Sequence, residues 1–449
     1  MKRKNILIML IVGMSLLLVA CGGKKHIEEQ RDSVRKENSE KNDKETDSKT
    51  DKETDKEIPL EVDKKENEKE NTNKKENKKE QGDDKKDLIV DMDYINLPES
   101  EGFEYESNGD GTCTLTKIGT CKDEDIVIPE KSPDGDTITK IGEYAFYNAE
   151  DITSIVFAGR TMEVDKKAFQ FCEFEKLVIT GSELTIGDNA FSYCEDIEEI
   201  YISNSTIEIG EYAFYDSGKD IDVKLVHCTG TLEKKAFQYS AILNLLIQNS
   251  NLEVDDSAFS YCEDISSVLF ENSTLEIGEY AFYDAGDNIV VSVNGCSINL
   301  EEKAFQFCDL VSLTIADSET VVEENAFSYC EDLTDIMIGA DNTTIGSYSF
   351  YECTSLVNIS IAEESKDDEI KILIDDNAFQ FCAVEKVVIG RGAVEIGDNA
   401  FSYCENLESV EFKGKSLKVG KYAFYDCPDT LKIKYNGNSY NQDSIEDVK

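Results

Sequence analysis

The chain has 449 residues, of which 40% are hydrophobic and 31% are charged, and its formal net charge at pH 7 is −48. Residues 24–87 carry 19 Lys and Arg against 22 Asp and Glu, whereas residues 88–449 carry 24 against 72 and so account for the whole acidic excess. A surface this acidic repels nucleic acid and anionic lipid headgroups, which excludes nucleic acid as a partner, and it favours cations or basic partners. Solubility and mutual repulsion at a cell surface explain the same charge without any ligand.

The amino terminus has the pattern of a secretory signal. Three basic residues precede an apolar run at residues 6–20, which is too short for a membrane span. The run Leu18-Val19-Ala20-Cys21 resembles a bacterial lipobox, at which lipoprotein signal peptidase cuts before a lipidated cysteine. The resemblance implies a signal peptide over residues 1–20 and a protein lipidated at Cys21, anchored to a bacterial membrane and exposed outside the cytoplasm. An uncleaved signal anchor is the alternative interpretation.

Residues 21–87 are predicted to be the lipidated Cys21 followed by a disordered, charged linker. From residue 24 onward the segment is mainly Lys, Glu, Asp, Asn and Thr, so it cannot bury enough apolar surface to offset the entropy of ordering. A fully extended chain of this length reaches on the order of 200 Å. A transient helix is the alternative, and in either case the segment acts as a spacer.

Residues 141–430 are built from repeats. The phrase Ile141-Gly142-Glu143-Tyr144-Ala145-Phe146 returns in altered form along the chain, and Ile, Val or Leu stands five residues before each phenylalanine. These phenylalanines are 22 or 23 residues apart, except for one step of 29 that indicates a surface insertion at residues 363–370. They are Phe146, Phe169, Phe191, Phe214, Phe237, Phe259, Phe282, Phe305, Phe327, Phe350, Phe379, Phe401 and Phe424. Such a period predicts a solenoid of about 13 repeats, in which stacked neighbours close one continuous core.

Each repeat is predicted to supply one short parallel strand and one short helical turn. In the strand at residues 197–202, Ile200 and Ile202 alternate with polar residues and therefore point toward the core. The helical turn that precedes this strand would direct Phe191 and Cys194 inward, because residues three apart share one helical face.

The phrase IGxxAFxxCxxL resembles the BspA-type leucine-rich repeat of bacterial surface proteins over roughly residues 101–440. The doublet Ala-Phe recurs in twelve of thirteen units, and Ser349-Phe350 is the departure. The resemblance implies a leucine-rich-repeat solenoid with a role in adhesion or another protein-binding task, in a family whose functions are diverse. Residues 88–140 are predicted to form an amino-terminal cap, and residues 431–449 a carboxy-terminal cap and tail, because an open solenoid end exposes core and strand edge.

A longer period is superposed on the repeats. The residue after each phenylalanine follows the order Tyr, Gln, Ser, which makes a cassette of three repeats and 68 residues, as from Phe214 to Phe282. We interpret this order as the record of triplet duplication.

Nine of the 14 cysteines lie three residues after a repeat phenylalanine. They are Cys172, Cys194, Cys262, Cys308, Cys330, Cys353, Cys382, Cys404 and Cys427. Ala or Ser replaces them in the other four repeats, so the position requires a small buried side chain, and we expect a ladder of free, inert thiols rather than disulfides or zinc ligands. Cys113 and Cys121 flank a short predicted hairpin in the cap, where pairing and two free thiols are both open.

We expect neither catalysis nor a metal or cofactor site. The only histidines are His26 and His227, so histidine-based catalysis and histidine metal sites lack partners. Acidic pairs such as Glu195-Asp196, Glu263-Asp264 and Glu331-Asp332 recur three repeats apart. They are weak Ca²⁺ sites or solvated turns leading into strands, and we favour turns because successive pairs are too far apart to share one ion.

Aromatic residues also recur at fixed positions. Two residues after the phenylalanine stand Tyr193, Tyr261, Tyr329 and Tyr403, and in the Gln-type repeats Phe171, Tyr239, Phe307 and Phe381. These rows are either carbohydrate-stacking surfaces or packing along the flank of the solenoid, and packing is the more usual reason for such a repeated aromatic.

The outward face of the predicted strands is the expected binding surface. Its central residues are Val156, Val178, Tyr201, Lys224, Leu246, Leu269, Ser292, Thr314, Met337, Ser360, Val388, Glu411 and Lys434. The first half of this row is mostly apolar or aromatic, which on so charged a chain suggests an interface, although β-propensity alone also favours Val and Leu. We therefore predict ligand contacts at Val156, Val178, Tyr201, Leu246 and Leu269.

The sequence thus favours a surface-anchored lipoprotein, not an enzyme, whose repeats bind protein ligands on host or neighbouring cell surfaces. A structural or shielding lipoprotein with no specific ligand is the first alternative. A secreted enzyme acting on glycans is the second, and the regularity of the repeats disfavours it.

Overall fold

The computed structural model describes residues 97–286, 288–339, 342–363 and 369–448. The predicted signal peptide, Cys21, the linker and the first residues of the predicted cap lie outside these ranges. Within them, strands of the repeats form two long sheets, which we call sheet A and sheet B, and each sheet has 15 strands. The predicted repeat solenoid is confirmed.

Sheet A contains β1 and β2 and then the even-numbered strands, in chain order. Its strands are β1 (Glu104–Ser107), β2 (Thr112–Lys117), β4 (Thr137–Ile141), β6 (Thr161–Val164), β8 (Glu183–Ile186), β10 (Thr206–Ile209), β12 (Thr229–Leu232), β14 (Asn251–Val254), β16 (Thr274–Ile277), β18 (Ser297–Leu300), β20 (Glu319–Val322), β22 (Thr343–Ile345), β24 (Lys371–Ile374), β26 (Ala393–Ile396) and β28 (Ser416–Val419).

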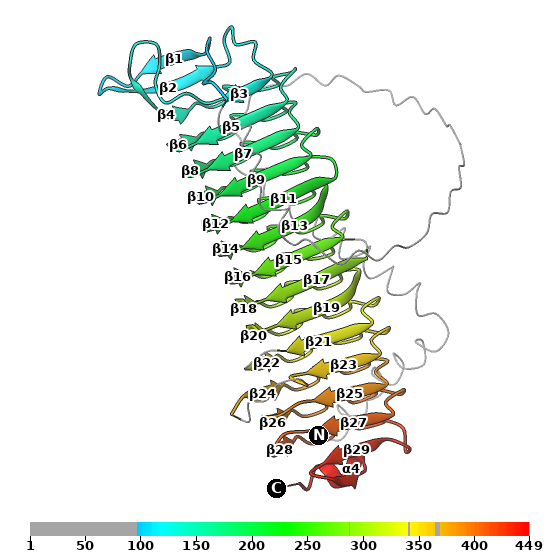
Figure 1. Cartoon of the computed structure of the whole chain (residues 1–449). Coiled ribbons are helices and arrows are strands. Elements are labelled where there is room, and N and C mark those ends of the chain that lie inside the picture. Colours follow the sequence, from blue (N-terminus) through cyan, green and yellow to red (C-terminus); the bar gives the residue numbers. More distant parts are fainter. Residues whose placement is uncertain (1–96, 287, 340–341, 364–368, 449) are drawn as a thin grey trace, which may run out of the picture. The chain divides into compact units, whose positions relative to one another are not determined.

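Sheet B contains the odd-numbered strands from β3 and ends with β30. Its strands are β3 (Asp125–Val127), β5 (Ser154–Ala158), β7 (Lys176–Thr180), β9 (Glu199–Ser203), β11 (Ile221–Val226), β13 (Ile242–Gln248), β15 (Ser267–Glu271), β17 (Ile289–Asn294), β19 (Leu310–Ala316), β21 (Asp335–Gly339), β23 (Asn358–Ile361), β25 (Lys386–Ile389), β27 (Ser409–Phe412), β29 (Lys432–Tyr435) and β30 (Asn438–Tyr440). Figure 1 shows the two series of strands along the two sides of one stack.

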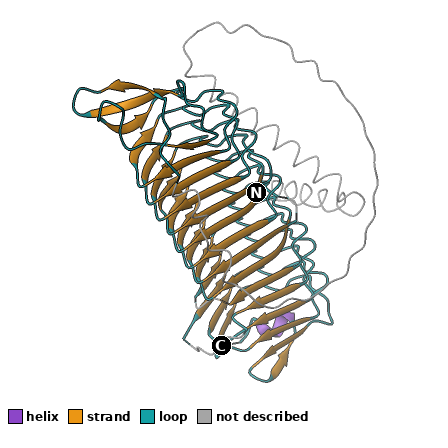
Figure 2. Ribbon diagram, turned by 45° about the horizontal axis from the view of Figure 1, so that its top comes forward, coloured by secondary structure: helices purple, strands orange, loops and turns teal. Residues whose placement is uncertain are grey.

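Each repeat therefore contributes two strands, whereas the sequence predicted one strand and a helical turn. In the repeat of Phe214, β10 ends at Ile209, the Ala213-Phe214 turn follows, and β11 begins at Ile221. The only helix in the described residues is α4 (Gln442–Ile445) at the carboxyl end, drawn in purple in Figure 2. The prediction of a helical turn in each repeat is not confirmed.

The backbone conformation explains why the Ala-Phe segment is not helical. Tyr212 and Asp216, two residues before and two after Phe214, have φ of 58° and 51°, and the same two positions are left-handed in every repeat. A right-handed helix cannot pass through such residues. The Phe214 amide instead donates to the carbonyl of Ala236 in the next repeat at 2.7 Å, so the turns are joined between repeats as the strands are.

The core lies between the two sheets and is closed on one flank by the phenylalanine turns. All thirteen repeat phenylalanines are buried, and successive rings are stacked with centroids 4.5–5.5 Å apart. Inward residues of both sheets, such as Ile200 and Ile202 of β9, pack against them in a single cluster. The continuous ring stack is the dense apolar interior that stacked repeats need, because one repeat cannot bury its own apolar face.

The two ends of the stack depart from the parallel pattern. At one end β1 pairs antiparallel with β2, and at the other β29 pairs antiparallel with β30. The side chain of Asn441 caps α4 by accepting from the Ser444 amide at 2.9 Å, and Ile445 of this helix is buried. The domain bounds given in the sequence analysis remain predictions.

Candidate binding surface

The central outward residues of sheet B form one continuous row, which we call the sheet B row. Strand pairing joins Val127 to Val156, Val178, Tyr201, Lys224, Leu246, Leu269, Ser292, Thr314, Met337, Ser360, Val388, Glu411 and Lys434 in register. The row predicted from the sequence is thus correct in register, and the structure adds Val127 at its beginning. Each residue stacks directly above its counterpart in the next repeat, so the row is a surface feature rather than a set of isolated positions.

Val156 and Val178 point outward but are not exposed. Their exposed fractions are 0% and 2%, and with Val127 they make a small buried cluster outside the main core. Leu97, in the segment that precedes β1, packs against this cluster. The expectation that these two valines are open to a ligand is therefore wrong for the described structure.

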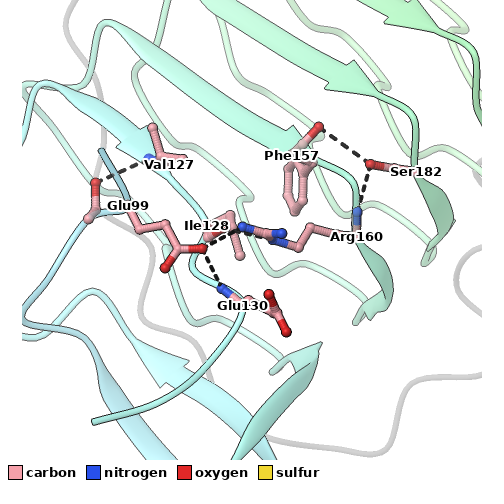
Figure 3. A network of polar contacts seen from close by, with 8 residues as sticks. Glu99, Val127, Ile128, Glu130, Phe157, Arg160 and Ser182 are labelled. Atoms are coloured by element: carbon pink, nitrogen blue, oxygen red, sulfur yellow. Dashed lines mark hydrogen bonds and ion pairs between the residues drawn. The ribbon is translucent and has the colours of Figure 1, made fainter. Parts of the chain in front are cut away.

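Polar contacts hold this segment in place. The Ser100 amide donates to the carbonyl of Val127 at 3.0 Å, and the Ser100 hydroxyl accepts from the Val127 amide at 3.1 Å. Glu99 Oε1 accepts from Arg160 Nη2 at 2.7 Å and from the Glu130 amide at 2.9 Å (Figure 3). We call residues 97–100 the cover segment.

Arg160 is the centre of this network. Its side chain is only 14% exposed, and its Nε donates to the carbonyl of Ile128 at 3.1 Å (Figure 3). Because the guanidinium is largely buried, its pairing with the Glu99 carboxylate is less screened by solvent than an exposed ion pair. This network around Arg160 was not predicted from the sequence. The signal available was the apolar Leu97-Pro98 within the predicted cap, and an arginine in repeats whose basic residues are otherwise lysines apart from Arg391.

The row opens to solvent from Tyr201 onward. Tyr201, Leu246 and Leu269 are half-buried, and Lys224 stands between Tyr201 and Leu246 with its side chain 39% exposed. Farther along, Met337 is the most exposed large apolar side chain among the described residues, at 54%. Val388 is buried, so the second half of the row offers fewer apolar contacts.

Polar side chains on either side of the open row are tied to one another between strands. Asn244 donates to Asp222 at 2.7 Å, and Gln248 donates to Glu271 at 2.6 Å. Lys224 Nζ lies 3.6 Å from Glu199. These cross-strand pairs hold the rim in one conformation, which lowers the entropy lost when a ligand docks on the apolar centre.

The outward face of sheet A has a different chemistry. The row in register on β10 to β18 is Glu208, Thr231, Glu253, Glu276 and Asn299. A hollow on this side of sheet A is lined by acids and amides, among them Glu253 and Asn299, and also by apolar residues such as Leu275 and Val321. The sheet A row is mostly polar in this stretch and has one exposed large apolar side chain, Val321, so sheet B with its three apolar anchors is the better candidate.

The flank of the stack carries an aromatic ladder with one ring from each repeat. Its rings are Tyr147, Phe171, Tyr193, Tyr215, Tyr239, Tyr261, Tyr283, Phe307, Tyr329, Tyr351, Phe381, Tyr403 and Tyr425, and neighbouring centroids lie 4.7–5.7 Å apart. The contacts between neighbouring rings support the packing interpretation, and Tyr147, Phe171 and Tyr425 are also exposed to solvent. The sequence analysis missed that tyrosine directly after phenylalanine completes the ladder in every third repeat.

The cysteine ladder is buried and bonded to the backbone. All thirteen cysteines of the described residues are buried free thiols, including Cys113 and Cys121. Eight of the nine repeat thiols donate to the phenylalanine carbonyl of the preceding repeat, with Sγ to O distances of 2.8–3.4 Å. Ser217 makes the same bond at 2.9 Å, which explains why Cys and Ser alternate at this position.

Burial also suppresses thiol chemistry. It raises the pKa of the Cys228 thiol to about 11 and that of the Cys427 thiol to about 12. Protonated, buried thiols are poor nucleophiles and poor metal ligands. Within the described ranges no group of three or more His, Cys, Asp or Glu is arranged to hold a metal ion. The acidic pair Glu263-Asp264 lies exposed in a turn before β15.

The family follows from the repeats. The family model for the BspA type leucine rich repeat region matches residues 120–244, 230–299, 291–370 and 372–446, in six copies. The chain belongs to the BspA-type leucine-rich-repeat family. The repeats of this family form a scaffold suited to protein interaction. No helix in the described residues of this family member is long and apolar enough to cross a membrane.

Solved structures with the leucine-rich-repeat fold resemble this BspA-type chain at low identity. A leucine-rich repeat protein from Bacteroides ovatus is 17% identical, with 75% of this chain and 87% of that one covered and a TM-score of 0.37. A leucine rich cell surface protein from Faecalibacterium prausnitzii is 19% identical, with 76% and 96% covered and a TM-score of 0.29.

A plant ectodomain with leucine-rich repeats also matches at low identity. The leucine-rich-repeat ectodomain of the receptor kinase GASSHO1/SCHENGEN3 from Arabidopsis thaliana, in complex with CASPARIAN STRIP INTEGRITY FACTOR 2, is 13% identical. The matched region covers 68% of this chain and 41% of the plant chain, with a TM-score of 0.26. These likenesses concern the fold alone. No curated protein matches the chain.

Proposed function

We propose that the protein is a surface lipoprotein, anchored through Cys21, whose solenoid binds protein ligands on the open part of the sheet B row, in cell-surface adhesion or host interaction. Tyr201, Leu246 and Leu269 are the proposed anchors. Val156 and Val178, which the sequence analysis included, are left out because the cover segment occupies them.

The observation that carries this proposal is an apolar row on an acidic molecule. Three large apolar side chains stand half-exposed on β9, β13 and β15, between rims of polar residues paired across the strands. Buried aromatic and aliphatic anchors inside a polar rim are the usual anatomy of a protein interface. Lys224 within the row supplies a positive charge, so an acidic edge on the ligand is compatible with it.

A binding rather than a catalytic role is supported by the regularity of the described repeats. His227 is the only histidine among the described residues, and the repeat thiols are buried. A thiol nucleophile beside a histidine base, one common arrangement in covalent catalysis, therefore has little support there.

The test replaces the three anchors in the full chain. The triple variant Tyr201→Ser, Leu246→Ser, Leu269→Ser should keep native circular dichroism, since all three side chains point away from the core. Its affinity for target cell surfaces should fall by roughly 1–2 kcal/mol or more, measured by saturable binding of labelled protein. The matched control is Val321→Ser with Leu373→Ser on the outward face of sheet A, which should bind as the parent does.

Unchanged affinity in the triple variant would place recognition elsewhere on the molecule. Absence of saturable binding by the parent protein to host and bacterial surfaces would favour a shielding lipoprotein without a specific ligand.

The anchor has a test of its own. A Cys21→Ala protein with its signal removed should leave the detergent phase, in which the parent remains, because acyl chains are the proposed membrane attachment. Quantitative detergent partition of Cys21→Ala would end the lipoprotein proposal and leave the binding proposal untouched.

A further inference from the structure

The ends of the two sheets are finished in different ways. At the amino end, sheet A begins with the antiparallel pair β1 and β2, and Ser100 bonds to Val127 of β3, the first strand of sheet B. At the carboxyl end, the antiparallel strand β30 completes sheet B. Sheet A ends at β28, a parallel strand with no further strand beside it among the described residues. An open strand edge is a template for pairing with another chain.

Backbone groups of β28 point toward this open edge. The Gly420 amide, directly after β28, donates to the carbonyl of Ile396 in β26 at 2.7 Å. Because the bonding direction alternates along a strand, the N–H and C=O groups of Leu417 and Val419 point away from β26. Within the described part of the chain, nothing forms a hydrogen bond with these groups. They are therefore available to an added strand.

The two ends of the stack are stepped in opposite senses. At the amino end, β1 and β2 of sheet A come before β3, the first strand of sheet B, whereas at the carboxyl end β29 and β30 of sheet B come after β28. Since each repeat adds one strand to each sheet, this order is also the order along the stack (Figure 1). Sheet A thus extends farther at the amino end and stops short at the carboxyl end. When the carboxyl end of one copy meets the amino end of another, β1 of the second copy can lie beside β28 of the first.

The strands β1 and β28 match in length, alternation and charge. Each is four residues long. On β28, Leu417 is buried on the core side and Lys418 lies on the outer side with its side chain 74% exposed. On β1, Tyr105 packs against the core, and its neighbours Glu104 and Glu106 are exposed. Antiparallel pairing that keeps the apolar sides together places Lys418 opposite Glu104 or Glu106, and opposite charges across strands stabilise the pair.

The surroundings of the two strands carry opposite charge. Residues 413–434 contain six lysines and two aspartates, all exposed, whereas the rest of residues 88–449 contains 18 Lys and Arg against 70 Asp and Glu. Residues 99–110, around β1, contain five acids and no Lys or Arg. At physiological salt, charges farther apart than about 8 Å are largely screened, so the charges near a contact outweigh the net charge of the whole chain. Lysine on an edge strand also disfavours pairing of β28 with a second β28.

We propose that copies of this chain associate head to tail, with β28 of one copy paired antiparallel to β1 of the next, so that sheet A continues from copy to copy. The two surfaces in this contact differ, so each added copy leaves a further β28 open, and the assembly is a row of copies rather than a closed dimer. A contact based on four-residue strands is small, so the association is reversible and depends on concentration. It involves neither the sheet B row nor any ligand, and therefore does not depend on the proposed function.

Sedimentation velocity tests the association. The whole mature chain is used with Cys21→Ala, so that acyl chains cannot drive it. We expect the weight-average mass to rise with protein concentration, and to rise less at high salt, because the paired charges are exposed. A mass that stays at that of one chain at every concentration would overturn the proposal.

Exchanged charges locate the contact. Lys418→Glu, and separately Glu104→Lys with Glu106→Lys, should each lower the association constant by about tenfold or more, because like charges then face each other. An equimolar mixture of the two proteins should associate again, since β28 of each variant then meets a β1 of opposite charge on the other. The matched control is Lys234→Glu, at a half-exposed lysine in the middle of the stack, which changes the net charge equally and should associate as the parent does. Unchanged association in the first two variants, or no recovery in their mixture, would contradict the contact.

A proline variant separates strand pairing from charge attraction alone. Val419→Pro removes an N–H that points to the open edge and leaves the bonds to β26 in place, so the fold should be kept and self-association lost. Circular dichroism checks the fold of this protein and of the charge variants. Association that persists in folded Val419→Pro protein would show that the copies do not join through the edge of β28.

Discussion

Gly230 shows how strictly one residue can be fixed by the stacking of repeats. It lies in β12 between Ile207 of β10 and Leu252 of β14, where the neighbouring repeats place a buried apolar side chain. Its φ is +129°, and an added Cβ would lie 1.8 Å from the carbonyl oxygen of Ile207. Glycine is therefore required by both backbone conformation and space.

We expect Gly230→Ala to destabilise the solenoid by roughly 2–4 kcal/mol, since β12 must move away from β10 to admit the methyl group. Chemical denaturation followed by circular dichroism measures this loss. Gly135→Ala is the matched control, because Gly135 also has a positive φ of +90° but has no atom within 4 Å of the added Cβ. Equal losses in the two variants would mean that backbone conformation alone, not the contact with Ile207, fixes Gly230.

The order of residues within the three-repeat cassette also has a reason at the scale of single residues. Gln170, Gln238, Gln306 and Gln380 each donate through Nε2 to the serine hydroxyl of the following repeat at 2.8–2.9 Å. A buried amide without such a partner would cost free energy, so Gln must be followed by Ser. Duplication of triplets explains how the order spread, and this bond explains why Gln and Ser stay adjacent.

At the scale of elements, the cysteine ladder is a structural column rather than a reactive one. Cys194, Cys262 and Cys308 are fully buried, and burial raises the pKa of each thiol above its usual range. We expect the repeat thiols to react with a thiol reagent at about pH 8 only after denaturation. Thiol counts before and after addition of denaturant measure this.

Engineered cysteines provide the controls for that count. Ser217→Cys adds a thiol at a ladder position that already bonds to Phe191, and it should stay unreactive in the folded protein. Ser297→Cys, at an exposed position of β18, should react at once. Rapid reaction of several native ladder thiols in the folded chain, or their recovery as disulfides, would contradict the assignment.

The strands show how far the sequence determines the elements. The alternation of Ile200 and Ile202 with polar neighbours gave the sheet B strands and the whole register of the sheet B row. The second strand of each repeat was missed, although Ile207 and Ile209 alternate with polar residues in β10 in the same way. A run of four residues does not by itself distinguish a strand from the turn that follows it. Only hydrogen bonding to the equivalent run of the next repeat makes this run a strand.

Other errors arose from contacts that no local pattern encodes. The helical turn failed because left-handed residues such as Tyr212 and Tyr280 interrupt it, and tyrosine gives no sign of a positive φ. The burial of Val156 and Val178 depends on Leu97, which is about 60 residues or more away in the chain. The predicted surface therefore lies on the correct face of the strands and has the correct register. It is wrong at Val156 and Val178, which Leu97 helps to bury.

At the scale of the whole molecule, acidic residues recur where strands of sheet A meet the phenylalanine turns. Glu233, Glu301 and Asp375 each follow directly after a strand of sheet A, at equivalent places in three repeats. Burial raises the pKa of each of these carboxyls, and neighbouring acids raise it further, among them Asp188 and Glu208 around Glu233. The stacking that builds the core thus also brings like charges together.

This repulsion predicts how stability responds to pH and salt. A carboxyl whose pKa is raised in the folded state stabilises the fold below its unfolded pKa, and this contribution is lost as the pH rises through the folded value. Lowering the pH from neutral toward the ordinary range of carboxyl pKa values should therefore raise the melting temperature, and added salt should raise it more at the higher pH, where more of these carboxylates are charged. Thermal denaturation followed by circular dichroism measures both effects.

Two single substitutions separate this effect from a general influence of pH. Glu233→Gln removes a charge that burial and neighbouring acids disfavour, so it should raise the melting temperature at neutral pH and progressively less as the pH falls through the raised pKa of Glu233. Glu363→Gln removes a charge that is attracted: Lys413 Nζ lies 2.9 Å from its Oε1, and hydrogen bonds from Lys413 and Ser360 lower the pKa of this carboxyl. That variant should lower the melting temperature, modestly because the pair is partly exposed. If both substitutions shift the melting temperature in the same direction, the raised pKa values of Glu233, Glu301 and Asp375 are not the source of its pH dependence.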